Sequence, residues 1–494
     1  GLRRLNATGF SGEYATNLST ANANVKLTAN AAATTTNTNS LILNGFGVTN
    51  PGGATTLPIA SASLAGNILI NTANDIAGAN TTLGITTNEL VILATANSTV
   101  SAVIGTAVAG PVTLSGTGNV TFSATNLYTG LTAINYATLT AGASNVLSSG
   151  AVTVNGGTYN LNGNSDTIGA LTLRAGTVTT GAGTITLGGN LTTIANGNHA
   201  SIVTGNLGLG ANRVFDIGDG LMDNDAIISA VISGAFTVTK STGAGVLMFA
   251  GDNSYTGLTT ISAGTLRLGA TGGGTNTPLG TIGNGTLVSG AGSALDLNGY
   301  TLGTNEALTL SGALAAGALQ NFSGNSVNYT GLITLGAAST IISNYGDLNI
   351  TNTGNITGNT FALTIGGMGN GTLSSNLNTT TGTLTKNGFG QWTVGNGTGL
   401  STYTGVTTIS AGTLKLGSAG NGTNTPFGTS AGGISITSGA ILDLNGFTLG
   451  TTEAVTSLNG TGLASKGALI NTSNNSISFN GAITLGAASR VANY

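Results

Sequence analysis

The chain repeats itself, and this self-similarity limits the folds that it can adopt more than any other feature of the sequence. The segment YTGLTTISAGTLRLG at 255–269 returns as YTGVTTISAGTLKLG at 403–417, an offset of 403 − 255 = 148 residues. The match includes ITLGAAS at 333–339 and 483–489, and a weaker copy begins with YTGLTAINYATLTAG at 128–142. Such a sequence predicts a repeated supersecondary unit whose neighbouring copies bury a continuous core.

These copies divide the chain into three repeats that follow a divergent beginning. We expect solenoid repeats at 112–235, 236–381 and 382–494, the last of them incomplete, and a β-rich or solenoid segment of similar style at 1–111. Each repeat is longer than one hairpin and contains several short strands at uneven spacing. This organisation fits several coils of a solenoid per repeat.

Short alternating segments, each closed by a turn signal, recur throughout the chain. TLRLG (265–269), TLKLG (413–417) and LDLNG (295–299 and 442–446) alternate apolar and polar residues and end in Gly or Asn-Gly. In parallel strands stacked about 4.8 Å apart, inward Val, Ile and Leu fill a narrow core, while outward Thr, Asn and Ser bond to their neighbours. The sequence therefore predicts an all-β fold, a parallel β-helix (β-solenoid) that forms a single elongated rod.

Composition removes most of the chemistry that an enzyme of this size would use. The 494 residues include no Cys, one His, 11 Lys and Arg, and 14 Asp and Glu, so 5% of them are charged, against roughly 25% in an ordinary soluble domain. Disulfides, thiolate nucleophiles and Cys-ligated zinc are excluded, and His199 without a partner of its own kind indicates a polar turn residue. The net charge of −3 disfavours nucleic-acid binding. We expect no enzymatic activity, no catalytic residue and no cofactor.

No apolar run in the sequence approaches the roughly 18 residues that indicate a membrane-spanning helix. We therefore expect no integral membrane segment.

The stretch GTLTKNGFGQWTVGNGTGLSTYTGVTTISAGTLKLG at 382–417 resembles the autotransporter-associated β-strand repeat, in which G-x-L-x-K-x-G-x-G, N-x-Y-T-G and G-T-L-x-L-G follow one another. The matching positions are Gly382, Leu384, Lys386, Gly388, Gly390, Tyr403, Thr404, Gly405, Gly412, Leu414 and Gly417. The preceding copy, from Phe236, has Lys240, Asn253 and Tyr255 at corresponding points. The resemblance covers 112–494 and implies a right-handed parallel β-helix of a secreted bacterial cell-surface protein. It implies no activity.

These features predict a non-enzymatic, extracellular, structural or adhesive β-solenoid that forms a fibre, stalk or filament at the bacterial cell surface. The chain is either part of a giant surface protein or a subunit that stacks head to tail, because the ends of a solenoid are open strand edges. We expect self-association, end to end or lateral, and a host surface, a neighbouring cell or a glycan as candidate partners. The alternative is a glycan-binding module. A glycan-cleaving module is a less favoured alternative.

One acidic cluster is the candidate for a metal or catalytic site. Asp216, Asp219, Asp223 and Asp225 lie within ten residues, and calcium prefers carboxylate oxygens as ligands. With Arg213, the same carboxylates are the place where a glycan-cleaving site could converge. A solvated acidic turn explains the cluster equally well, so we assign no metal-binding residue.

Aromatic residues are the candidate for a glycan-binding surface. Trp392 stands where the preceding copy has Leu247, which indicates packing. Four tyrosines begin Tyr-Thr-Gly triplets and would form either an aromatic strip for glycans or packed corners with satisfied hydroxyl groups: Tyr128, Tyr255, Tyr329 and Tyr403. We favour packing for these tyrosines. An exposed aromatic row along one face would favour the glycan-binding alternative.

Overall fold

The computed structural model describes residues 15–19, 23–34, 37–43, 45–49, 54–59, 66–76, 81–85, 88–105, 110–312, 317–397 and 399–494. The chain divides into two compact units, unit 1 up to Phe236 and unit 2 from Thr237 to Tyr494. The expected repeat boundaries at 111/112, 235/236 and 381/382 stay predictions. The described residues contain strands and one short 3₁₀ helix, η1 (Leu463–Ser465), and no helix among them is long and apolar enough to span a membrane.

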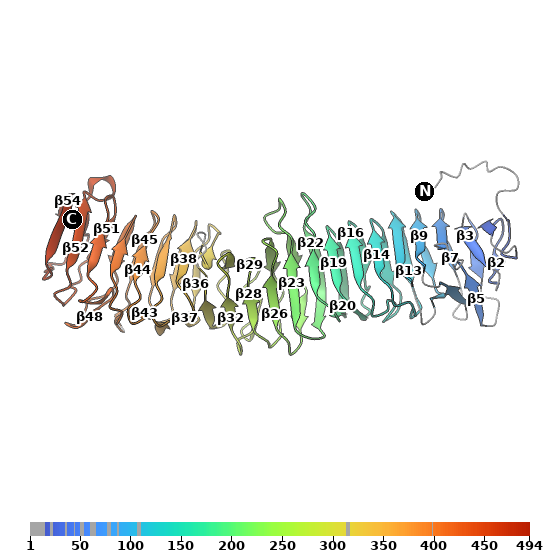
Figure 1. Cartoon of the computed structure of the whole chain (residues 1–494), viewed down its shortest axis with the longest axis horizontal. Coiled ribbons are helices and arrows are strands. Elements are labelled where there is room, and N and C mark those ends of the chain that lie inside the picture. Colours follow the sequence, from blue (N-terminus) through green and yellow to red (C-terminus); the bar gives the residue numbers. More distant parts are fainter. Residues whose placement is uncertain are drawn as a thin grey trace. The chain divides into compact units, whose positions relative to one another are not determined.

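Unit 1 is a stack of coils whose strands pair in parallel (Figure 1). Val112 pairs with Thr132, and Val152 pairs with Leu171, so that one coil takes about 20 residues (132 − 112 = 20 and 171 − 152 = 19). The divergent beginning continues the same stack, because β9 pairs with both β6 and β12.

The strands of unit 1 form three sheets. The first contains β1 (Ala23–Lys26), β3 (Thr38–Leu43), β6 (Gly66–Ile70), β9 (Leu90–Ala94), β12 (Val112–Gly116), β14 (Thr132–Asn135), β16 (Val152–Asn155), β19 (Leu171–Arg174), β21 (Leu191–Thr193) and β23 (Arg213–Ile217). The second contains β2 (Ala31–Ala32), β4 (Val48–Thr49), β7 (Asn74–Ile76), β10 (Ser98–Val100), β13 (Asn119–Phe122), β15 (Thr138–Ala141), β17 (Thr158–Asn160), β18 (Asp166–Ile168), β20 (Thr177–Leu187), β22 (Ser201–Leu209), β24 (Ala226–Ile228) and β25 (Val231–Ser233). The third contains β5 (Thr55–Pro58), β8 (Thr81–Gly84) and β11 (Val103–Ile104).

Unit 2 is also a stack of parallel coils with three sheets. The first contains β26 (Val238–Ser241), β28 (Thr259–Ile261), β32 (Thr286–Val288), β34 (Leu308–Leu310), β37 (Ile333–Leu335), β40 (Asn355–Thr357) and β43 (Asn376–Asn378). The second contains β27 (Val246–Phe249), β29 (Gly264–Leu268), β33 (Ser293–Asp296), β35 (Leu319–Asn321), β38 (Ser339–Ser343), β41 (Leu363–Gly367), β44 (Leu384–Lys386), β46 (Thr407–Ile409), β50 (Ile434–Ile436), β52 (Val455–Gly460) and β54 (Ile483–Ser489). The third contains β36 (Val327–Tyr329), β39 (Leu348–Ile350), β42 (Gly371–Leu373), β45 (Gln391–Val394), β47 (Thr413–Leu416), β51 (Ile441–Asp443), β53 (Leu469–Asn471) and β55 (Val491–Asn493).

Two antiparallel hairpins lengthen coils of unit 2. They are β30 (Asn276–Thr277) with β31 (Gly280–Thr281) and β48 (Asn424–Thr425) with β49 (Gly428–Thr429). Both come from the repeated sequences TNTPLG and TNTPFG, so the two copies fold alike at this point.

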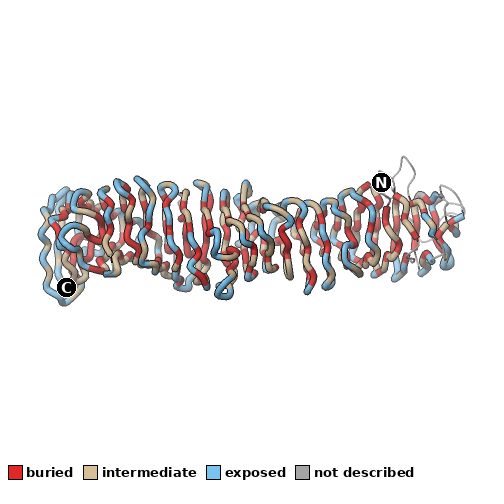
Figure 2. The backbone as a smooth tube through the Cα atoms, turned by 90° about the horizontal axis from the view of Figure 1, so that it is seen from below, coloured by how far each residue is buried: buried red, intermediate tan, exposed pale blue. Residues whose placement is uncertain are grey.

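The core follows from the alternation of side chains along each strand. In β9, for example, Leu90, Ile92 and Ala94 are fully buried and the two residues between them are half-buried. Figure 2 shows the same alternation of buried and exposed residues along the coils of each unit. The prediction of an all-β fold of stacked parallel coils is confirmed, whereas the right-handed winding and the single rod stay predictions.

Candidate functional site

Each of the two closest repeat copies buries a lysine at its start. Lys386, at the end of β44, donates hydrogen bonds of 2.9, 2.8 and 3.0 Å from Nζ to the carbonyl oxygens of Asn387, Gly388 and Ala411. Lys240 on β26 donates in the same way to Gly243 and Ala263, at 2.9 and 2.8 Å. Burial lowers the pKa of Lys386 to about 8. Both ammonium groups therefore join their own turn to the following coil.

The tyrosines of the Tyr-Thr-Gly triplets lie in the core. Tyr329 donates a hydrogen bond to the carbonyl oxygen of Glu306 at 2.6 Å. The other three hydroxyl groups lie 2.6 to 2.7 Å from the Oγ1 atom of a threonine four residues later, in the pairs Tyr128–Thr132, Tyr255–Thr259 and Tyr403–Thr407. Burial raises the pKa of all four phenol groups. These tyrosines are packing residues and form no surface strip for glycans.

Two buried carboxyl groups, which the sequence analysis did not single out, lie near these tyrosines. Glu306 Oε1 accepts a hydrogen bond from Thr286 Oγ1 at 3.0 Å, and Glu453 Oε2 accepts one from Thr425 Oγ1 at 2.8 Å. The second oxygen of each carboxyl group is buried with no hydrogen-bond partner among the described residues. Burial raises the pKa of each glutamate to about 7. The repeated sequences LGTNEA and LGTTEA, which contain them, were the signal that could have identified them.

The four aspartates of the acidic cluster have different environments. Asp216 lies on β23, Asp219 and Asp223 are exposed in the loop that leads to β24, and Asp225 is buried. Asp225 Oδ1 accepts a hydrogen bond from the amide of Gly220 at 2.7 Å, which closes the loop on itself. Across the described part of the chain, no three His, Cys, Asp or Glu side chains lie close enough together to hold a metal ion. The geometry therefore gives no support to a calcium site.

Arg213 and His199 lie in separate surroundings. The guanidinium group of Arg213 donates from Nε and Nη2 to the carbonyl oxygen of Leu187, at 2.9 and 2.7 Å, so it joins neighbouring coils. His199 is exposed in the loop between β21 and β22.

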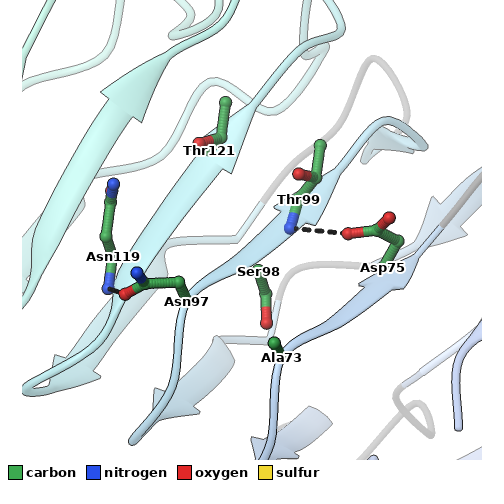
Figure 3. Close-up of a pocket in the computed structure, with 7 residues that line it drawn as sticks. All are labelled: Ala73, Asp75, Asn97, Ser98, Thr99, Asn119 and Thr121. Carbon is green, nitrogen blue, oxygen red and sulfur yellow. Dashed lines mark hydrogen bonds between the residues drawn. The ribbon is translucent and has the colours of Figure 1, made fainter.

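A polar hollow lies on the second sheet of unit 1 (Figure 3). Asp75 Oδ1 accepts a hydrogen bond from the amide of Thr99 at 3.2 Å, and Asn97 Oδ1 accepts one from the amide of Asn119 at 3.1 Å. Each side chain therefore binds the backbone of the next coil and keeps the coils in register. The lining residues are Ala73, Asp75, Asn97, Ser98, Thr99, Asn119 and Thr121. A single carboxyl group among them does not provide the acid and base pair that glycan cleavage requires.

Comparison with protein families gives two matches, both in unit 2. Residues 242–268 and 384–416 match the passenger-associated-transport-repeat. The first segment begins two residues after Lys240 and runs from β27 to β29, and the second contains Lys386 and runs from β44 to β47. The chain is a β-solenoid, and these two segments are similar to the repeat of autotransporter passengers. No curated protein and no solved structure matches it.

The polar groups of the passenger repeat are used to join coils. Trp392, within the second match, is fully buried, and its Nε1 donates a hydrogen bond to the carbonyl oxygen of Gly366 in the preceding coil at 3.1 Å. Trp392 thus packs in the core, as its alignment with Leu247 indicates. Trp392 and the tyrosines of the Tyr-Thr-Gly triplets therefore lie in the core, in agreement with the favoured packing interpretation.

Proposed function

We propose that this passenger-like β-solenoid is a non-enzymatic structural and adhesive protein of the bacterial cell surface, where it forms or contributes to a fibre, stalk or filament. The observation that carries the proposal is that the buried lysines of the two repeat copies bind the following coil and the tyrosines pack in the core, instead of surrounding a cleft. Stacked repeats of this kind provide length and extended surfaces for binding. The passenger repeat itself is typical of surface or secreted proteins.

Self-association is part of the proposal. With 5% charged residues and a net charge of −3, two copies of the chain meet little electrostatic repulsion as they approach each other. Sedimentation velocity over a hundredfold range of protein concentration tests this point. The sedimentation coefficient is expected to rise with concentration, and a constant monomer value would contradict self-association.

Adhesion is tested with beads that carry the full chain at a defined density. Under shear flow, we expect these beads to be retained on bacterial cells or on polysaccharide-coated surfaces several times more than beads coated with albumin. Retention equal to that of albumin on every surface would contradict the adhesive function.

An assay of polysaccharide cleavage tests the proposal that the protein has no enzymatic activity. Incubation of the protein with soluble polysaccharides is expected to produce no new reducing ends. Production of reducing ends that is lost in the Asp219→Ala, Asp223→Ala double variant would establish the glycan-cleaving alternative instead.

A further inference from the structure

Four exposed apolar side chains follow one another on successive coils of unit 2. Phe322, Tyr345, Met368 and Phe389 are 44%, 64%, 68% and 64% exposed. They lie in the turns from β35 to β36, β38 to β39, β41 to β42 and β44 to β45, and we call them the corner row. Single exposed apolar side chains are common on protein surfaces, whereas contiguous ones mark sites of interaction.

Backbone hydrogen bonds bring the four turns side by side. One bond of 2.7 to 3.0 Å joins each turn to the turn before it, in the pairs Gly346–Ser323, Gly369–Ser343 and Gly390–Gly367. The rings of Phe322 and Tyr345 are in contact, with centroids 5.2 Å apart and planes at 88°. The corner row therefore places one exposed apolar side chain on each of four neighbouring turns, and the first two of these side chains are in contact.

The repeat copies indicate that the coil does not require these apolar side chains. Alignment of NFSGN (321–325) with NTSNN (471–475) places Thr472 at the position of Phe322. Both turns have the same backbone contact, because the amide of Phe322 donates to Asp296 Oδ1 at 3.0 Å and that of Thr472 donates to Asp443 Oδ1 at 3.1 Å. The same kind of turn thus forms with either a phenylalanine or a threonine at this position.

The other end of the corner row gives the same result. Alignment of the Gly-x-Gly of residues 388–390 with that of residues 243–245 places Ala244 at the position of Phe389. Phe389 is 64% exposed, so its ring contributes little to the core. Folding therefore does not explain why the two end positions of the corner row are aromatic.

A ladder of uncharged polar side chains lies on the sheet that follows the corner row. Asn328, Asn349, Thr372 and Thr393 pair in register on β36, β39, β42 and β45. Asn349 Nδ2 donates to Asn328 Oδ1 at 3.2 Å, and Thr372 Oγ1 donates to Asn349 Oδ1 at 3.0 Å. In the last three coils the ladder residue comes four positions after the residue of the corner row. The strip therefore combines an apolar ridge with amide and hydroxyl groups.

We propose that the corner row and this ladder bind a linear, uncharged glycan that lies along the stack of coils. The proposal rests on the proposed adhesive function and names the class of its ligand. The electron-rich faces of Phe and Tyr attract the C–H groups of a pyranose ring, and amides and hydroxyl groups hydrogen-bond to sugar hydroxyl groups. Because coils repeat every 4.8 Å or so, a distance close to the length of one sugar in an extended chain, successive coils meet successive sugars. A neutral polymer fits best, since the row and the ladder carry no charge.

The test uses the full chain and variants copied from its own repeats. The Phe322→Thr, Phe389→Ala double variant introduces the residues that the other copies carry. Binding of linear glucose, xylose, mannose and N-acetylglucosamine oligomers of one to six units is measured by calorimetry, with polygalacturonate as the acidic probe. We expect the affinity of the unaltered protein for a neutral oligomer to increase with length up to about four units, one for each coil of the row. In the double variant we expect affinity to fall about tenfold or more, at an unchanged thermal unfolding temperature.

The matched control is Ile282→Ala, which removes an apolar side chain of 49% exposure in the loop between β31 and β32, away from the corner row. This variant is expected to bind like the unaltered protein. The proposal is wrong if the unaltered protein binds no neutral oligomer, if it prefers polygalacturonate, or if the double variant binds as well as the unaltered protein. It is also wrong if the double variant abolishes self-association without an effect on glycan binding, because the row would then be a contact between copies.

Bead retention separates this proposal from the adhesive function on which it rests. If beads with the unaltered protein and with the double variant are retained equally, adhesion stands and the corner row is not its site. If beads with the unaltered protein are not retained, the adhesive function itself is wrong, whatever the calorimetry of the oligomers gives.

Discussion

The heptapeptide ITLGAAS occurs twice in unit 2 and forms two different structures. In the first copy, Ile333–Leu335 form β37 and Ser339 begins β38, so the peptide turns from one sheet into the next. In the second copy, Ile483–Ser489 form the single strand β54. Leu335 is 2% exposed, whereas Leu485 is 64% exposed. The leucine of the heptapeptide is therefore buried in the first copy and exposed in the second, which lies in the last coil that the structure describes.

The neighbouring coils account for the difference. β37 pairs with β34 and with β40, so coils on both sides cover its apolar side chains. β54 pairs with β52, and shifts in register interrupt that pairing. In a stack of repeats, stability is approximately the sum of each repeat and its contacts with its neighbours. The burial of a side chain in a repeated peptide thus depends on the coils that are stacked against it.

Removal of the leucine side chain is the strongest test of this comparison. Leu335→Ala leaves a cavity in the core, and we expect it to lower the free energy of unfolding by about 4 kcal/mol. Leu485→Ala removes an exposed side chain, so its effect should be within about 0.5 kcal/mol. Denaturant unfolding followed by circular dichroism measures both. Equal losses in the two variants would mean that the stacked coils are not the cause of the difference.

Glu306 and Glu453 occupy equivalent positions in two repeat copies. Unlike Leu335 and Leu485, both of these side chains are buried. Each pKa is raised to about 7 from an ordinary value near 4.5, so the carboxyl group contributes stability that is complete below pH 4.5 and is lost as the pH rises through 7. The unaltered protein should therefore be more stable at pH 4.5 than at pH 8, by about 3 kcal/mol for each carboxyl group.

The Glu306→Gln and Glu453→Gln variants isolate these contributions in urea unfolding at several pH values. In each variant, the free energy of unfolding should depend less on pH than in the unaltered protein. The reduction should be similar for the two variants. If the free energy of unfolding of a variant depends on pH as strongly as that of the unaltered protein, the carboxyl group that the variant lacks is not a source of the pH dependence.

The buried lysines test whether the passenger repeat fixes coil contacts in the same way in both copies. Lys386→Met removes the donor from three carbonyl oxygens, and we expect a loss of about 2 kcal/mol in the free energy of unfolding. Lys240→Met should lose a similar amount. The measurement is equilibrium unfolding at pH 7. A stabilised Lys386→Met variant would show that the desolvation of the ammonium group outweighs its hydrogen bonds.

The smallest effect is expected at the tyrosine hydroxyl groups. Tyr403→Phe removes the contact with Thr407 Oγ1 and should lower stability by about 1 kcal/mol. The control is Tyr136→Phe, because Tyr136 is 75% exposed. Thermal unfolding of the two variants gives the comparison. Equal shifts in unfolding temperature would contradict the assignment of Tyr403 as a buried, bonded packing residue.

The sequence by itself determined the architecture of the coils. The alternation of apolar and polar residues in segments such as TLRLG (265–269), and the 148-residue offset between copies, were sufficient to predict an all-β stack of parallel strands. Alignment of Trp392 with Leu247 was sufficient to place the indole in the core. These features depend on the period of two residues in a strand and on the comparison of copies, both of which can be read along the chain.

Only the tertiary structure decided which residues lie against one another from coil to coil. It buried Glu306 and brought Phe322, Tyr345, Met368 and Phe389 into one row, which no motif in the sequence indicated. The physical reason is that burial at a turn depends on a residue one coil away, and coils differ in length. Thr259 pairs with Thr286 and Thr286 with Leu308, steps of 286 − 259 = 27 and 308 − 286 = 22 residues. No fixed period in the sequence therefore relates the residues that stack.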